Sequence, residues 1–255
     1  MKRICFLSLK GGTGKTTTVF NVSTELARKG LRVLAIDLDP QGYLTCSFNE
    51  STSAGRKSVH DVIKGTPVHE AIRKTSTGVH LLAADLELTT ADLDLSGEER
   101  SYFMQKALSK VNQYDVVVFD CCPFLGILSV NALVASDELI IPTEAEFLAM
   151  RGVRQLYLKV VQLIQRELNP SLQFSGVVIT RYDMRKRIHQ QTAEKMASMF
   201  PDKVFDTKIR TNVALAESGM KGIPVSEYRP NSNGAIDYRT LTEEIIERYN
   251  LPVSE

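Results

Sequence analysis

The stretch Lys10-Gly11-Gly12-Thr13-Gly14-Lys15-Thr16-Thr17 sets the fold of this chain. An apolar run at residues 4–9 precedes it, and a helical pattern with Val19, Val22 and Leu26 on one side comes directly after it. The glycines let the backbone curl so that successive N–H groups point inward, and the helix start adds the positive end of its dipole. A strand, a glycine turn and a helix start in this order predict a cradle for the phosphates of a nucleotide.

Two side chains of this stretch have roles that follow from their places. Lys15 is expected to neutralise charge on the β- and γ-phosphates, and the Thr16 hydroxyl to ligate a Mg²⁺ ion that bridges them. The general phosphate-binding loop, or P-loop, has a glycine where this chain has Leu9, and here Lys10 directly precedes the double glycine. A turn that merely caps a helix is the alternative, and the many matched positions in a strand–helix context disfavour it.

Two carboxylates stand at the end of the second predicted strand, residues 32–37, in the segment Asp37-Leu38-Asp39-Pro40-Gln41-Gly42. Alternate residues leave a strand on the same side, which here faces the P-loop. We therefore expect Asp39 to orient or polarise the attacking water near the γ-phosphate, and Asp37 to lie closer to the Mg²⁺ shell. A turn capped by Asp39, with Pro40 and Gly42 as turn residues, is an alternative that is compatible with catalysis.

The segment Tyr114-Asp115-Val116-Val117-Val118-Phe119-Asp120 supplies a second signal for a phosphate site. Its valines and phenylalanine predict a buried central strand, and Asp120 stands at the carboxyl end. This is the Walker B arrangement, in which the aspartate holds Mg²⁺, usually through water. The pattern alone is weak, but together with the P-loop it is strong.

Alternating apolar runs and helical patterns predict an α/β fold. Further strands are expected at residues 79–83, 116–119, 139–141, 174–179 and 204–205, and helices at residues 98–110, 129–135, 150–168, 190–199 and 236–249. We expect a doubly wound, mostly parallel sheet with helices on both faces and with its chemistry at the carboxyl ends of the strands. At 255 residues, the chain is expected to form a single domain, residues 1–255, in which residues 49–57 form a surface loop.

Composition narrows the class of protein. The hydrophobic fraction of 43% suffices for a sizeable core, and a net charge of +1 does not by itself indicate a nucleic-acid binder. Neither a membrane span nor a secretory signal is expected. Cys5, Cys46, Cys121 and Cys122 have no framework spacing, so we expect reduced thiols in a cytoplasmic protein and no metal or redox site at Cys121-Cys122-Pro123.

Beyond these motifs, the chain resembles the short ParA/Soj partition ATPases over nearly its whole length. Lys-Gly-Gly-x-Gly-Lys-Thr is the deviant P-loop of the ParA/MinD superfamily, to which they belong. Segments at residues 129–133, 141–146, 180–183, 204–209 and 212–217 also look like family segments. The resemblance implies a slow, Mg²⁺-dependent ATPase that dimerises on ATP, binds DNA without sequence preference and is stimulated by a ParB-type centromere-binding protein. It further implies a cytoplasmic, nucleoid-associated protein that moves a chromosome or plasmid.

The resemblance also assigns residues. Lys10 is implied to reach across the dimer to the partner's phosphates, so the predicted catalytic residues are Lys10, Lys15 and Asp39. The predicted magnesium residues are Thr16, Asp39 and Asp120. For the nucleotide, the implied contacts are Lys10, Gly11, Gly12, Thr13, Gly14, Lys15, Thr16 and Thr17 at the phosphates and Thr180, Arg181, Ile209, Arg210 and Asn212 around the adenine.

Departures from the family pattern affect the expected DNA surface. The family usually has an arginine just after the Asn-Val pair, where this chain has Ala214, and only Pro123 remains of the usual pair of prolines after the Walker B acid. Arg181, Arg185, Lys186 and Arg187, with His189 nearby, are a candidate cluster for phosphate contacts. A solvated helix start is the alternative interpretation of this cluster.

Other functions are compatible with parts of the sequence. A switch that positions a protein assembly, with weak or no DNA binding, is the main alternative. A MinD-like membrane switch would need a basic, amphipathic tail, and residues 249–255 are too short and too acidic for that role. A nucleotide-gated binding module without hydrolysis is disfavoured by the intact Asp39 and Asp120. An iron–sulfur reductase would need paired cysteines, and a tyrosine kinase of this superfamily would need a C-terminal tyrosine cluster. This sequence offers neither feature.

Overall fold

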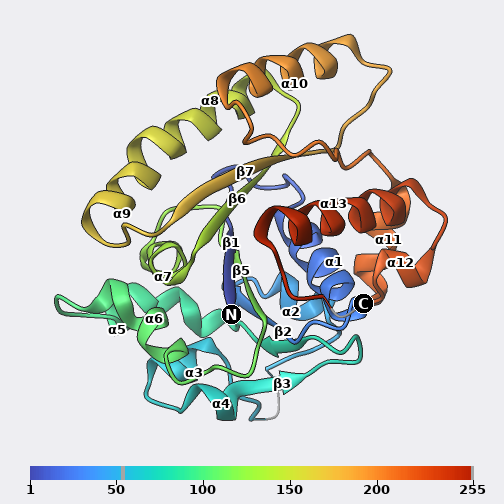
Figure 1. The fold of residues 1–255 in the computed structure, drawn as a ribbon. Helices are drawn as coiled ribbons and strands as arrows, with labels where there is room; N and C mark the ends of the chain where they lie inside the picture. The colour runs from blue at the N-terminus through green and yellow to red at the C-terminus, as the bar shows by residue number, and fades with distance from the viewer. Residues whose placement is uncertain (53–54, 254–255) are drawn as a thin grey trace.

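A seven-stranded sheet forms the centre of the computed structural model, which describes residues 1–52 and 55–253 (Figure 1). The strand order is β3-β4-β2-β5-β1-β6-β7, and all neighbours are parallel except the antiparallel pair β3 and β4. The strands are β1 Lys2–Phe6, β2 Val33–Leu38, β3 Ile72–Lys74, β4 His80–Leu82, β5 Val116–Cys121, β6 Glu138–Glu144 and β7 Gln173–Thr180. The expected doubly wound, mostly parallel sheet is therefore confirmed.

Helices cover both faces of the sheet because the central strands are apolar at successive positions. In β1, Ile4 and Phe6 join the core beneath α1 and α13, whereas Cys5 joins the core on the opposite face. The first face carries α1 Lys15–Arg28, α2 Tyr43–Ser47, α11 Val213–Lys221, α12 Val225–Tyr228 and α13 Asn233–Tyr249. The other carries α3 Val59–Ile63, α4 Val68–Ala71, α5 Ala91–Asp94, α6 Phe103–Leu108, α7 Ile127–Ala135, α8 Phe147–Leu156, α9 Gln162–Glu167 and α10 Arg187–Met199.

Short helical segments of other types complete the architecture. Two 3₁₀ segments, η1 Leu86–Thr90 and η2 Arg100–Tyr102, precede α5 and α6. A π-helical segment, η3 Tyr157–Val161, joins α8 to α9, so the long helix expected at residues 150–168 is continuous but widened in its middle. The helix predicted at residues 98–110 begins as η2 and ends earlier, at Leu108.

The sequence patterns were wrong at one strand and missed another. Residues 204–205 form no strand: Val204 makes one isolated bridge to Val177, and the segment covers the edge of β7. Strand β3 was missed because its Ile-Arg-Lys sequence lacks an apolar run, and it forms only through pairing with β4. The short helices α2 to α5, α11 and α12 were also missed, since their few turns give little periodicity.

Two predicted segments are described only in part. Residues 53–54 of the predicted loop at 49–57, and residues 254–255 of the tail at 249–255, lie outside the described residues. Within the described ranges, no helix combines the length and the apolar character needed to cross a bilayer.

Candidate active site

The predicted phosphate cradle lies where β1 passes into α1, at the carboxyl edge of the sheet. Gly12 and Gly14 have φ values of 78° and 77°, a left-handed conformation that glycine adopts without steric cost. Gly14 is also the N-cap of α1, so the N-terminus of a 14-residue helix faces the cleft. The cleft has a volume of about 490 Å³. Its lining consists of residues 10–17, Asp39, Tyr43, Cys46, Ser47, Pro123, Arg181, Gly219 and Met220.

Lys15 lies on the floor of this cleft, bound to the Walker B acid. Its Nζ is 2.5 Å from Oδ1 of Asp120, and the two side chains are 8% and 0% exposed. Burial alone would lower the pKa of Lys15, but the charge and hydrogen bond of Asp120 outweigh it and raise that pKa. Burial raises the pKa of Asp120, whereas the charge and hydrogen bond of Lys15 and the nearby hydroxyl of Thr16 oppose the rise. The predicted Lys15, Thr16 and Asp120 are therefore brought together.

Asp37 is the second buried acid of the site. It lies opposite Asp120 in the register between β2 and β5 and is not exposed. Its Oδ2 accepts hydrogen bonds of 2.8 Å from both the backbone N–H and the hydroxyl of Thr45, at the start of α2. Burial, followed by the charge of Asp120, raises the pKa of Asp37 to about 7. These two hydrogen bonds fix the position of α2 relative to the site.

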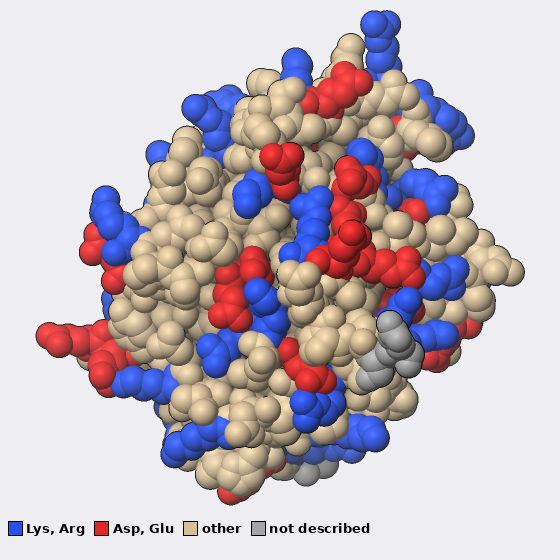
Figure 2. Space-filling view, in the orientation of Figure 1, with Lys and Arg blue, Asp and Glu red and all other residues tan. Residues whose placement is uncertain are grey.

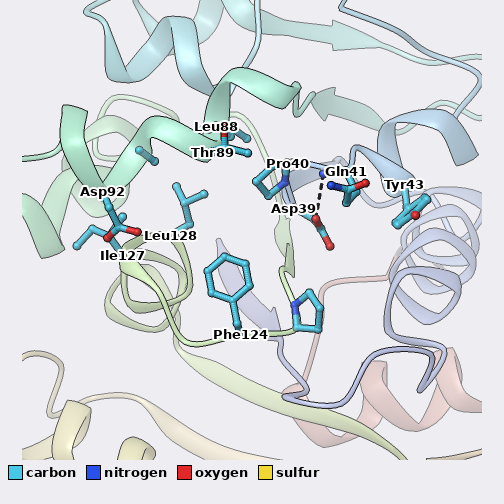
Figure 3. A pocket seen from close by; sticks show the side chains of 12 residues that line it. Asp39, Pro40, Gln41, Tyr43, Leu88, Thr89, Asp92, Phe124, Ile127 and Leu128 are labelled. Carbon is cyan, nitrogen blue, oxygen red and sulfur yellow. Dashed lines mark hydrogen bonds between the residues drawn. The ribbon is translucent and has the colours of Figure 1, made fainter.

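Asp39 lines the cleft and also a neighbouring apolar pocket of about 340 Å³, which Figure 3 shows. Its Oδ1 accepts the N–H of Gln41 at 3.0 Å, and its backbone carbonyl accepts the N–H of Gly42 at 2.8 Å. The turn proposed as the alternative role of Asp39 is thus present. The same residue lines both cavities, and Phe124, which is 54% exposed, forms part of the wall of the apolar one.

The acids of the cleft fit a magnesium ion. Oδ2 of Asp120 is buried and has no hydrogen-bond partner among the described residues. An orphaned carboxylate oxygen of this kind is costly unless a cation or its water shell satisfies it. Thr16 and Asp39 line the cleft, and Asp120 contacts Lys15, which is another of the lining residues. Thr16, Asp39 and Asp120 are therefore the residues that could hold Mg²⁺ or its water ligands.

Lys10 projects at the rim and binds two acids of its own chain. Its Nζ contacts Oε2 of Glu144, at the end of β6, and lies 2.9 Å from Oε2 of Glu146. The hydrogen bonds to Glu144 and then Glu146 raise the pKa of Lys10. Arg181, with a left-handed φ of 48°, adds a second cation 3.6 Å from Glu144. Sequence reasoning missed both glutamates, because only the pairing of β6 with its neighbours brings them to the P-loop.

The residues expected around the adenine do not line one common site in the structure. Thr180 supports the P-loop from below, since its hydroxyl donates to the carbonyl of Thr13 at 2.6 Å. Arg210 forms a bidentate ion pair with Asp237 of α13, and Asn212 caps α11 through the N–H of Ala214. Of the expected set, Arg181 alone lines the cleft as described, beside Gly219 and Met220, which no sequence signal indicated. The adenine assignments stay predictions.

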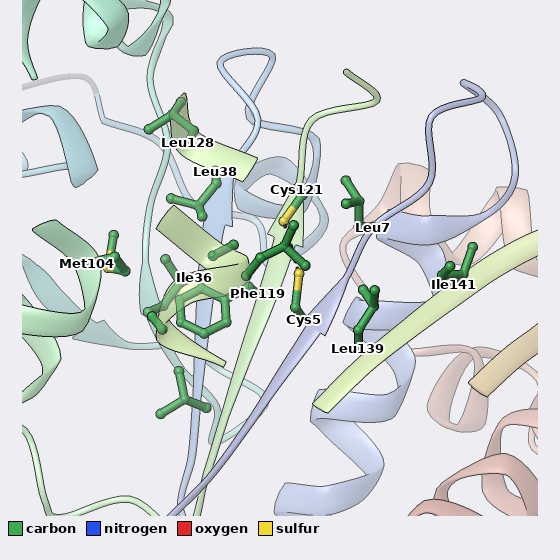
Figure 4. Close-up of a cluster of buried hydrophobic side chains, with 14 of the residues drawn as sticks. Cys5, Leu7, Ile36, Leu38, Met104, Phe119, Cys121, Leu128, Leu139 and Ile141 are labelled. Carbon is green, nitrogen blue, oxygen red and sulfur yellow. Dashed lines mark hydrogen bonds between the residues drawn. The ribbon is translucent and has the colours of Figure 1, made fainter. Parts of the chain in front are cut away.

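The cysteines are more closely placed than expected. No metal or redox site was expected at Cys121-Cys122-Pro123, but the Sγ atoms of Cys5 and Cys121 are 3.5 Å apart, because β1 and β5 are adjacent (Figure 4). Both thiols are fully buried in the core, and Cys122 lies beneath Ser129 with an Sγ–Oγ distance of 3.4 Å. The hydrogen bond with Cys5, followed by burial, raises the pKa of Cys121.

The expected basic cluster at the start of α10 is partly neutralised. Arg185 forms a bidentate ion pair with Asp183, at 3.0 Å for each contact, and Arg181 faces Glu144. Lys186 and Arg187 are exposed and have no ion pair among the described residues. Exposed Arg151 and Arg154 on α8 extend the positive surface, and sequence reasoning missed them. Figure 2 shows lysine and arginine side chains along this edge of the molecule, over α8 and α10.

Comparison with known proteins places this geometry in a family. Residues 1–174 match the family model described as an AAA domain. The chain is 37% identical over 248 residues to the sporulation initiation inhibitor protein Soj of Bacillus subtilis, covering 96% of this chain and 98% of Soj. It is 34% identical over 256 residues to the chromosome-partitioning ATPase Soj of Treponema pallidum, covering 97% of this chain and 98% of that protein.

Solved structures give the same relationship. Cobyrinic acid a,c-diamide synthase from Mycobacterium smegmatis, solved with ADP and magnesium, is 32% identical and superposes with a TM-score of 0.86, covering 98% of this chain and 95% of that one. The same protein with an ATP analogue and magnesium gives a TM-score of 0.87. The chain therefore belongs to the ParA/MinD superfamily as a ParA/Soj-like P-loop ATPase, with ATP and Mg²⁺ as its cofactors.

Proposed function

We propose that residues 1–255 form one ATPase domain that acts as a nucleotide switch in the partitioning of DNA. Two ATP-bound copies pack face to face, and the dimer binds duplex DNA without sequence preference. A ParB-type protein stimulates hydrolysis and releases the dimer. The observation that carries this proposal is the place of Lys10: it lies at the rim of the P-loop cleft, 49% exposed, and only ion pairs near the surface hold it. Such pairs contribute only about 0–1 kcal/mol to stability, so the phosphates of ATP bound to a second copy can compete for this lysine.

The chemistry follows from the residues of the cleft. Mg²⁺, when bound, neutralises phosphate charge. We infer that Lys15 exchanges Asp120 for the β- and γ-phosphates, which leaves the Asp120 carboxylate to the water shell of the ion. Asp39 orients the attacking water, and the turn that it forms with Gln41 fixes its backbone. Because phosphoryl transfer depends mainly on positioning and charge stabilisation, this arrangement is slow until a partner completes it.

Exposed apolar side chains support a face-to-face dimer. Around the P-loop rim, Leu9 is 43% exposed, Tyr43 60%, Phe147 55% and Met220 89%. Tyr43 and Met220 line the cleft, and Phe147 follows Glu146, the partner of Lys10. An apolar rim around a polar centre is typical of a surface that another protein covers.

The DNA surface is assigned to Arg151, Arg154, Lys186 and Arg187. These side chains are exposed on α8 and at the start of the neighbouring helix α10, where Lys186 is the N-cap. Arg181 and Arg185 contribute less, since acids of this chain already face them. Ala214 is 1% exposed and offers nothing to this surface, so the basic residues of α8 and α10 replace the arginine that the family usually carries there.

The test is a mobility shift on non-specific duplex DNA with ATP, with ADP and without nucleotide, at two salt concentrations. Binding is expected with ATP only and to weaken steeply with salt, because released counterions drive it. The double variant Lys186→Ala/Arg187→Ala is expected to bind several-fold more weakly. Lys106→Ala is the matched control, since this exposed lysine lies on α6, away from α8 and α10.

A switch that positions a protein assembly is the second candidate function. The observation that favours it is the partial neutralisation of the basic cluster by Asp183 and Glu144. Absence of DNA binding in every nucleotide state, with ATP-dependent dimerisation intact, would overturn the DNA proposal in favour of this one.

A further inference from the structure

A cluster of potential metal ligands lies outside the nucleotide cleft, between α3, η1 and α5. One ligand atom each of His60, Asp85 and Glu87 can be chosen so that all lie within 4.8 Å of one another. His60 belongs to α3, and the two acids stand at the start of η1, so the cluster joins segments separated by more than 20 residues in the sequence. No step of the proposed ATPase mechanism uses any of these side chains.

Asp85 is the least satisfied member of the cluster. It occupies the N-cap position of η1, where an aspartate usually accepts hydrogen bonds from the first turn, but its side chain makes no such bond. Its Oδ1 is buried and has no hydrogen-bond partner among the residues described. A buried carboxylate oxygen without a donor is costly, so its place calls for a positive or donating group.

His60 is oriented from both sides. Its Nδ1 lies 3.2 Å from Oε2 of Glu87, and its Nε2 lies 3.1 Å from Oδ2 of Asp94, which also accepts the hydroxyl of Thr90 at 2.6 Å. When Nε2–H donates to Asp94, the lone pair of Nδ1 faces Glu87. A carboxylate that fixes an imidazole in this way is the usual outer partner of a metal-binding histidine.

We propose that His60, Asp85 and Glu87 form a binding site for a zinc-class divalent ion, with Asp94 as the positioning residue of His60. One imidazole and two carboxylates suit Zn²⁺, whereas Mg²⁺ and Ca²⁺ prefer oxygen ligands throughout. The separation of 3.2 Å between Nδ1 and Oε2 matches two corners of a tetrahedron with metal bonds of about 2.0–2.1 Å. Solvent reaches Glu87, whose side chain is 74% exposed, so water is available as the fourth ligand.

The bound ion would fasten α3 to η1. The residues that follow Glu87 include Leu88 and Thr89, which line the apolar pocket beside Asp39. The site therefore supports one wall of that pocket, and metal binding stabilises the folded protein by linkage.

The experiment is a titration of the full chain with Zn²⁺ by calorimetry and with Co²⁺ by visible absorption. Excess Mg²⁺ and ADP occupy the nucleotide cleft, and Cys46→Ser removes the exposed thiol. This parent is expected to bind one equivalent, and the Co²⁺ spectrum to be that of a site without thiolate. His69→Ala, a change at an exposed histidine on the short helix α4, is the matched control and is expected to bind like the parent.

Three variants separate a metal site from a purely ionic cluster. His60→Ala and Asp85→Asn each remove a ligand, and their affinity is expected to fall by more than the about 10–100-fold expected for Asp94→Asn, which removes only the outer partner. Each variant's melting temperature without added metal checks that it folds. No stoichiometric binding by the parent, or equal affinity in His60→Ala and the parent, would overturn the site. Unchanged affinity in Asp94→Asn would overturn the positioning role.

Discussion

Asp37 and Asp120 lie opposite each other in the register between β2 and β5, and neither side chain is exposed. Lys15 contacts Asp120 at 2.5 Å, while Thr45 and the backbone of Asp39 supply the hydrogen bonds of Asp37. Two acids of like charge in adjacent strands cannot both ionise cheaply inside the protein. Without bound nucleotide, the site therefore links the stability of the fold to pH.

The first prediction concerns this linkage. The pKa of Asp37 is raised from its usual 3.8 to about 7, so the folded protein holds this proton more tightly than the unfolded chain. The contribution to stability is fully present below the unfolded pKa and is lost as the pH rises through the folded one, at up to about 1.4 kcal/mol per pH unit from this group. Urea unfolding in EDTA, without nucleotide, from pH 5 to pH 8 measures it.

Asp37→Asn is expected to flatten this pH dependence, because an amide does not titrate. Asp92→Asn, at an exposed acid on α5, is the control and should retain the slope of the wild type. Equal slopes for Asp37→Asn and the wild type would contradict the assignment.

The second prediction separates Lys15 from Asp39. Lys15→Ala removes the lysine that is expected to contact the phosphates. ATP binding is expected to weaken by about 100-fold or more, since Lys15 contributes a charge-assisted contact in a partly buried site. The substitution also leaves Asp120 buried without its cation, which costs about 3–5 kcal/mol if the acid stays ionised. Asp39→Ala is expected to retain ATP and to accumulate as the dimer. Fluorescent-nucleotide titration with light scattering compares them, and equal loss of ATP binding in both variants would refute the separate roles.

The third prediction concerns the ion pairs of Lys10. Glu146→Gln weakens the hold of this chain on Lys10, and the monomer–dimer equilibrium with ATP is expected to shift toward the dimer by up to about fivefold, the range of an exposed ion pair. Lys10→Ala is expected to bind ATP as a monomer and to fail to dimerise. Analytical ultracentrifugation measures both, with Glu98→Gln, an exposed acid near η2, as the control. A dimer of normal affinity in Lys10→Ala would rule out its reach across the interface.

The fourth prediction tests the segment that covers the edge of β7. A Cβ atom added at Gly176 would lie 2.6 Å from the Phe205 ring and 2.7 Å from the carbonyl oxygen of Lys203. Gly176→Ala is therefore expected to lower the free energy of unfolding by about 1–3 kcal/mol. Gly152→Ala, in α8 with open space around it, is expected to be neutral or to raise it by about 0.5–1 kcal/mol. If urea unfolding gives Gly176→Ala the same free energy of unfolding as the wild type, residues 203–205 move away from the added methyl group easily.

Much of the fold could be predicted because its signals are local. The P-loop stretch and the apolar runs at residues 32–37 and 116–119 each specify one strand and the turn after it, and the α/β alternation fixes a parallel sheet. Strand β3 and the short helices could not be predicted in this way. Their few residues carry little periodicity, and packing against elements far along the chain decides their conformation.

In the candidate site, too, the local features could be predicted from the sequence and the contacts between distant residues could not. The amino-acid sequence alone predicts which chemical groups bind phosphate, since Gly12, Gly14 and Lys15 lie within one loop whose backbone conformation depends on local residues. Tertiary contacts, in contrast, determine which groups face one another: Asp37 against Asp120, Lys10 against Glu144, and His60 against Asp85 and Glu87. Strand register and helix packing set these contacts, and no pattern along the chain encodes the distance between side chains that belong to different elements.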